Sequence, residues 1–181
     1  AAGVWKRITT TAPQDADAWN QLGYALCWSG DYQGALAAVH EYARVRPAEP
    51  NPIDSEGDIH FWFGKYSEAA KSYAAANAKS PSFLSGGEVY KEAWAKFLAG
   101  DKAGADASFS AFQQLRADAK DPSVTLFAAD WQYRTGRAKD ARNTANAALR
   151  NDSPAPVRAA LAAQLALWDL MDGDRAAAAK D

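Results

Sequence analysis

The chain has 181 residues and a formal net charge of −2, and 43 of its residues are alanine, whereas valine and isoleucine together number nine. Alanine has the highest helix propensity and β-branched residues favour strands, so this composition excludes a β-sandwich or barrel and makes a parallel sheet very unfavourable. The nearly balanced charge excludes the basic surface that nucleic-acid binding needs. No apolar run approaches the roughly eighteen residues that cross a bilayer. We therefore expect an all-α protein that neither binds nucleic acid nor inserts into a membrane.

Apolar periodicity, glycines and prolines predict eleven helices. In chain order they span residues 1–11, 16–29, 32–46, 52–63, 66–79, 86–99, 102–117, 122–135, 138–150, 155–172 and 174–181. Residues 81–88 interrupt the pattern with two adjacent glycines. We expect a loop or joint there and no domain boundary.

A repeat of 34 to 37 residues runs through these helices. A glycine ends the first helix of each pair, an alanine follows five residues later, and a small residue precedes the glycine by seven. The glycines are Gly30, Gly64, Gly100, Gly136 and Gly173; the alanines are Ala35, Ala69, Ala105, Ala141 and Ala178; the small residues are Gly23, Gly57, Ala93, Ala129 and Ala166. This register predicts helix pairs that cross closely and stack on their neighbours, because one pair cannot bury its apolar face alone.

The pattern resembles the tetratricopeptide repeat, whose 34-residue unit begins W-x2-L-G-x2-Y, continues with A-x3-F and closes with proline. Residues 16–49 match through Trp19, Leu22, Gly23, Gly30, Asp31, Tyr32, Ala35, Val39 and Pro47, and residues 50–83 through Gly57, Gly64, Lys65, Tyr66, Ala69, Tyr73, Ala76 and Pro81. The later units keep the turn glycine and the alanine but lose the closing proline. The second unit departs from the family by placing Glu56 where leucine is usual.

This resemblance implies one right-handed superhelical α-solenoid of antiparallel helix pairs over residues 1–181. We expect a half repeat at 1–15, repeats at 16–49, 50–83, 84–119 and 120–155, and a partial repeat at 156–181. The ends fall within repeats, so we expect a segment of a longer protein, with a mature chain left by signal cleavage as the competing interpretation. The single cysteine, Cys27, favours a cytoplasmic location and leaves a periplasmic or secreted one open.

In tetratricopeptide arrays the first helices of successive repeats line a concave groove that usually holds a peptide, so the resemblance implies a non-catalytic scaffold that binds protein or peptide. By register, the groove residues are Asn20, Tyr24, Trp28, Asp54, Asp58, Phe61, Trp62, Tyr90, Lys91, Trp94, Asp130, Tyr133 and Arg134. Aromatic side chains with acidic positions between them suit a peptide that carries apolar anchors and a basic group. The alternative for each aromatic residue is burial between adjacent helices.

Two further hypotheses stay open. In one, the chain is a structural or autoregulatory segment of a larger protein, since residues 52–109 bear a weaker similarity to repeat arrays behind bacterial Ser/Thr protein kinase domains. In the other, Asp54, Glu56, Asp58 and His60 bind a metal or act as a hydrolase. We expect no enzyme, cofactor or metal site, because helical spacing places Asp54 and Asp58 on one face and Glu56 and His60 on another. The partner's identity and the oligomeric state are left open.

Overall fold

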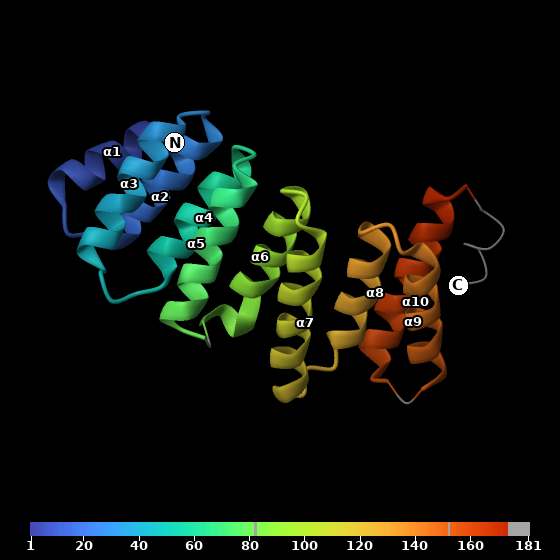
Figure 1. Cartoon of the computed structure of the whole chain (residues 1–181). Coiled ribbons are helices and arrows are strands. Elements are labelled where there is room, and N and C mark those ends of the chain that lie inside the picture. Colours follow the sequence, from blue (N-terminus) through green and yellow to red (C-terminus); the bar gives the residue numbers. More distant parts are fainter. Residues whose placement is uncertain (82, 152, 174–181) are drawn as a thin grey trace. The chain divides into compact units, whose positions relative to one another are not determined.

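The computed structural model describes residues 1–81, 83–151 and 153–173 of the chain (Figure 1). These residues form ten α-helices and one 3₁₀ turn, and they contain no strand, which confirms the predicted all-α fold class. The elements are α1 (Ala2–Thr11), α2 (Ala16–Trp28), α3 (Tyr32–Val45), α4 (Asn51–Trp62), α5 (Tyr66–Lys79), η1 (Phe83–Gly86), α6 (Gly87–Leu98), α7 (Lys102–Asp118), α8 (Val124–Arg134), α9 (Ala138–Arg150) and α10 (Ala155–Met171). The first ten predicted helices agree with them to within two residues at each end. The eleventh prediction, 174–181, lies outside the described residues, and so does Ala178.

The chain divides into two compact units, Ala1–Phe112 (unit 1) and Gln113–Asp181 (unit 2), with the boundary inside α7. In unit 1, α2 packs against α3 and α4 against α5, and each pair lies antiparallel and side by side in Figure 1. Helix α2 also contacts α4, so the first helices of these two pairs are neighbours. In unit 2, α8 packs against α9, and α10 contacts both. Among the described helices, none has the length and apolarity needed to cross a membrane.

Small residues let the helices of each pair approach closely, as the repeat register predicts. The alanines that follow the turn are fully buried at Ala35, Ala69, Ala105 and Ala141. On the facing helix, a Cβ added to Gly23 would lie 2.8 Å from Val39 Cγ2, and one added to Gly57 would lie 2.6 Å from the Tyr73 ring. These two glycines are therefore required by the space that their neighbours occupy.

The turn within each pair closes in the same way. Its glycine has a positive φ, from 70° at Gly64 to 90° at Gly100, a region that side chains disfavour. The residue after the glycine donates its backbone N–H to a carbonyl five residues earlier, as in Asp31 to Leu26 at 3.0 Å. This is a Schellman cap, which ends the first helix and reverses the chain.

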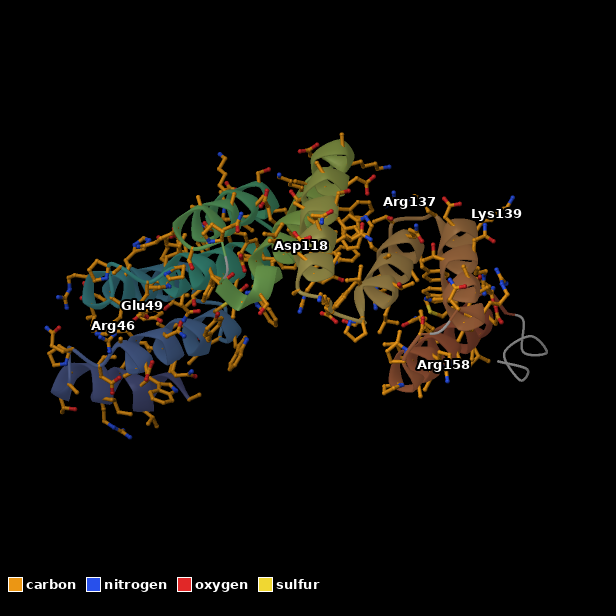
Figure 2. All side chains as sticks on the ribbon, turned by 90° about the horizontal axis from the view of Figure 1, so that it is seen from below. Arg46, Glu49, Asp118, Arg137, Lys139 and Arg158 are labelled. Carbon is orange, nitrogen blue, oxygen red and sulfur yellow. The ribbon has the colours of Figure 1, made fainter. Side chains whose placement is uncertain are left out.

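The connections between pairs are more varied. Between α3 and α4, Arg46 and Glu49 form an ion pair of 3.5 Å, and both are labelled in Figure 2. Between α5 and α6, where we predicted a loop or joint, Leu84 (φ 47°), Ser85 (φ 53°) and Gly86 (φ 82°) are successively left-handed. Two of them carry side chains, so this joint is conformationally strained.

Candidate functional site

The predicted site residues of unit 1 lie on α2, α4 and α6, and a chain of polar contacts links these three helices. Tyr24 Oη donates to Asp58 Oδ2 at 2.8 Å, and Lys91 Nζ donates to Asp58 Oδ1 at 2.9 Å. We call the surface that includes these groups the first-helix face. It is made of Tyr24, Trp28, Asp54, Asp58, Phe61, Trp62, Tyr90, Lys91 and Trp94.

Asp58 is the centre of this network. Besides Tyr24 and Lys91, it accepts a hydrogen bond from Tyr73 Oη at 2.8 Å. Burial raises the pKa of both tyrosines above the ordinary value, and the negative charge of Asp58 raises it further. Both phenols therefore stay protonated and serve as donors to the carboxylate. Tyr24 also contacts Ser55 Oγ at 3.3 Å.

Lys91 bridges the two aspartates of α4. Its ammonium donates to Asp54 Oδ2 at 2.7 Å and lies 5.4 Å from the centre of the Tyr73 ring. Burial alone would lower the pKa of Lys91, but the carboxylates of Asp58 and Asp54 outweigh burial and raise it. The lysine is thus held in its charged form.

Two carboxyl groups beside Lys91 are buried with unused acceptor atoms. Asp54 is 3% exposed and Glu88 is 0% exposed. Asp54 Oδ1 accepts no hydrogen bond from the residues described, and neither Glu88 oxygen accepts one from another of these residues. Burial raises the pKa of each carboxyl, and the charge of Asp54 contributes to the rise at Glu88. We call Asp54, Asp58 and Glu88 the carboxylate cluster. The register placed Asp54 on the groove face, whereas the structure has this residue buried, with its Oδ2 accepting a hydrogen bond from Lys91 Nζ.

Exposed apolar side chains flank the cluster. Trp28 is 66% exposed and Trp62 63%, and each lies four residues beyond Tyr24 or Asp58 on the same helix face. The rings of Tyr24 and Trp28 are 6.2 Å apart. Leu98 on α6 is 45% exposed. It was not predicted as a site residue, although it too precedes a turn glycine by two positions and the repeat register would have found it.

The remaining aromatic residues of the face take part in helix packing. The Phe61 ring meets Tyr66 edge to face at 5.3 Å, and the Tyr90 ring lies 4.9 Å from that of Phe112. Trp94 packs edge to face on Phe97 at 6.0 Å. All of them are half-buried, in keeping with the packing interpretation that the sequence left open. Asn20 is half-buried as well, and its Oδ1 accepts no hydrogen bond from the described residues.

The three predicted site residues of unit 2 form a group of their own. Asp130 and Arg134 make an ion pair of 2.8 Å along α8. Tyr133 stacks on Trp168 with ring centres 4.5 Å apart, and its hydroxyl donates to Asp172 at 3.1 Å. Burial raises the pKa of Tyr133. These side chains are engaged within unit 2.

The polar segment of α4 separates into two halves, as helical spacing predicts. Asp54 and Asp58 face Lys91, whereas Glu56 Oε1 lies 3.6 Å from His60 Nε2 and 3.5 Å from His40 Nε2. Tyr32 Oη hydrogen-bonds with His60 Nδ1 at 3.0 Å. The four residues considered for metal or hydrolase chemistry therefore do not converge on one point. Within the part of the chain that the structure describes, no three or more His, Cys, Asp or Glu side chains are arranged to hold a metal ion.

Known proteins share this architecture at low sequence identity. No family model and no curated protein matches the chain. Among solved structures, TTC0263, a thermophilic TPR protein from Thermus thermophilus, is similar with a TM-score of 0.62 and 17% identity over 91% of this chain and 88% of that one. YrrB, described as a TPR protein with an unusual peptide-binding site, has a TM-score of 0.57 and 15% identity over 98% of this chain and 88% of its own.

MamA gives a TM-score of 0.61 and 13% identity, over 82% of this chain and 84% of that one. At such identities the likeness is one of fold, and it agrees with the repeat register, the Schellman turns and the helix pairs. The sequence-based resemblance is thereby confirmed at the level of the fold: the chain has the all-α architecture of tetratricopeptide repeat proteins.

Proposed function

We propose that this protein is a non-catalytic interaction scaffold that binds a peptide segment of a partner on the first-helix face of unit 1. The observation that carries the proposal is the pair of tryptophans at equivalent repeat positions, Trp28 and Trp62, which are 66% and 63% exposed. A large exposed apolar side chain is costly in water, and tryptophan is enriched among the residues that dominate binding energy.

Two further features support this choice of surface. Asp58, which is partly exposed and lies four residues before Trp62 on α4, gives the face an acidic position, so the favoured segment carries apolar anchors together with a basic group. The fold neighbours support a role in protein interaction, and one of them, YrrB, is described as having a peptide-binding site. Side chains from four helices, α2, α4, α5 and α6, hold this face together, which favours a helix arrangement that is pre-organised for binding.

The test uses the whole chain against a phage-displayed random peptide library, with enriched peptides resynthesised and their affinities measured by fluorescence anisotropy. The Trp28→Ala/Trp62→Ala double variant should lose at least about tenfold in affinity, since buried aromatic anchors carry a large share of binding energy. Leu170→Ala is the matched control, because Leu170 is a similarly exposed apolar residue on α10. Enrichment of no peptide, or equal binding by the double variant and the wild type, would overturn the proposal.

A further inference from the structure

The carboxylate cluster has more hydrogen-bond acceptors than the free protein uses. Two carboxyl groups, those of Asp54 and Asp58, contact one ammonium, and Asp54 Oδ1 and both oxygens of the neighbouring Glu88 are buried without a donor from another of the described residues. A buried polar atom without a partner costs about 1–3 kcal/mol, so such atoms are rare in native structures and require an explanation. Here the unpaired oxygens lie next to a surface proposed to bind a partner.

Lys91 occupies the position that a cationic ligand would take. Its ammonium has what a bound cation needs, namely the carboxylates of Asp54 and Asp58 and the face of the Tyr73 ring. The Lys91 side chain is 33% exposed and that of Asp58 27%, whereas Asp54 and Glu88 are buried. Since it is anchored to α6 by a flexible stem, the ammonium can leave for solvent and open access to the two buried carboxyls.

We propose that the carboxylate cluster is a recognition pocket for an arginine side chain of the partner, and that Lys91 fills this pocket in the free protein. The inference rests on the proposed function and names the basic group that the first-helix face selects. Arginine is favoured over lysine because a guanidinium has five N–H donors and an ammonium three. The additional donors match the acceptor atoms of Asp54 and Glu88 that Lys91 leaves unused.

Occupation by Lys91 has a distinctive thermodynamic consequence. A ligand that must displace an internal occupant binds with an apparent affinity reduced by the fraction of molecules in which the pocket is open. Removal of the Lys91 ammonium should therefore strengthen the binding of an arginine-bearing peptide. If Lys91 only stabilised the fold, removal of its ammonium would instead weaken peptide binding, because the first-helix face would be less ordered.

The experiment compares two synthetic peptide pools, in which Trp, Phe or Leu residues flank either a central arginine or a central norleucine. Affinities are measured by fluorescence anisotropy for the wild type, Lys91→Ala and Lys96→Ala. Lys96 is a matched control on the same helix, because it is similarly exposed and paired with Glu92, outside the cluster. We expect Lys91→Ala to bind the arginine pool about tenfold more tightly, with the norleucine pool and Lys96→Ala unchanged. Asp58→Asn should remove the preference for arginine.

A second measurement is independent of any peptide. Millimolar n-propylguanidinium, which has the length of an arginine side chain, should raise the melting temperature of Lys91→Ala and leave that of the wild type unchanged, with n-butanol as the neutral control. If n-propylguanidinium does not raise the melting temperature of Lys91→Ala, the proposed arginine pocket is overturned. Weaker or unchanged binding of the arginine pool by Lys91→Ala also overturns it. If n-propylguanidinium stabilises Lys91→Ala but neither pool binds any form of the protein, the pocket stands and the proposed function fails.

Discussion

Single residues on the first helices of unit 1 are constrained by side chains from other helices. Asp58 on α4 is held by Tyr24 from α2, Tyr73 from α5 and Lys91 from α6. Its position on the helix face could be predicted from the spacing of α4 alone. The burial of Asp54 could not, because it depends on where a lysine 37 residues later places its ammonium. Local periodicity predicts which face of a helix a residue lies on, whereas contacts with residues distant in sequence determine how exposed its side chain is.

At the same scale, Gly57→Ala is expected to destabilise the protein. Helix propensity alone would favour alanine by about 1 kcal/mol. The added Cβ would, however, lie 2.6 Å from Tyr73 Cε1, and the ring cannot retreat without straining its hydrogen bond to Asp58. Crowding of this kind typically costs about 1–3 kcal/mol. Urea denaturation should therefore show a net loss of up to roughly 2 kcal/mol in the free energy of unfolding.

Gly3→Ala is the matched control for this substitution. Gly3 lies in α1, and a Cβ there would meet nothing within 4 Å. Propensity should then act alone, giving unchanged or slightly increased stability. If Gly57→Ala were as stable as Gly3→Ala, the close approach of α4 and α5 would not be what selects glycine at position 57.

Helices and their turns were the most predictable scale of this molecule. Each pair carries its own stop signal, a glycine such as Gly64 that adopts a positive φ, so the helix ends follow from short-range sequence. The joint at Leu84 and Ser85 was less predictable, because two side-chain-bearing residues are left-handed there and no local preference calls for that. Tertiary packing of α5 and α6 overrides residue preference at this point.

The connection between α7 and α8 contains a carboxylate, Asp121, that should make the stability of the fold depend on pH. Asp121 accepts hydrogen bonds from Ser123 Oγ at 2.6 Å and Ser123 N at 2.8 Å, and pairs with Arg116 at 3.0 Å. The Ser123 hydroxyl, then its backbone N–H and Arg116, lower the pKa of Asp121 below the ordinary 3.8. A carboxylate whose folded pKa is lowered stabilises the fold above its unfolded pKa, and this contribution is lost as the pH falls through the folded value.

Asp121→Asn should therefore reduce stability near neutral pH by about 1 kcal/mol or less, and should converge with the wild type as the pH falls below the lowered folded pKa of Asp121. Chemical denaturation at a series of pH values measures this difference. Ser123→Ala, which keeps the carboxylate but removes one donor, should show a smaller change of the same sign. A difference between Asp121→Asn and the wild type that is independent of pH would contradict the assignment.

At the scale of the whole molecule, the division into two units predicts that a core substitution in one unit destabilises mainly the helices of that unit. Leu161 on α10 is 0% exposed and packs in the unit 2 core with Ala145, Leu165 and Trp168. Leu161→Ala should cost about 2–5 kcal/mol within that core. In repeat proteins each element is stabilised by its neighbours, so hydrogen exchange should accelerate in α8 to α10 and stay near the wild-type rate in α2 to α5. Equal acceleration in both units would show that the chain unfolds as one cooperative body.

The overall architecture followed from the sequence because it is periodic: one register of glycine and alanine, repeated along the chain, predicts the same helix pair each time. The division inside α7 at Phe112 was not predicted, since nothing local marks it. The identity of a partner was equally out of reach, because repeat periodicity describes what the units share, and binding depends on where they differ. Lys91 and Glu88 are such differences.

The chain of contacts from Tyr24 through Asp58 to Lys91 also limits how this protein can evolve. Repeat arrays commonly change by duplicating, deleting or exchanging whole units, since one unit resembles the next. Here the three side chains come from different predicted repeats, so removal of the segment that carries Lys91 would leave Asp54 and Asp58 without their counter-charge, and removal of the segment that carries Tyr24 would take a hydrogen-bond donor from Asp58. Because a buried carboxylate without its partner is strongly destabilising, we expect the three predicted repeats to be exchangeable only as a set.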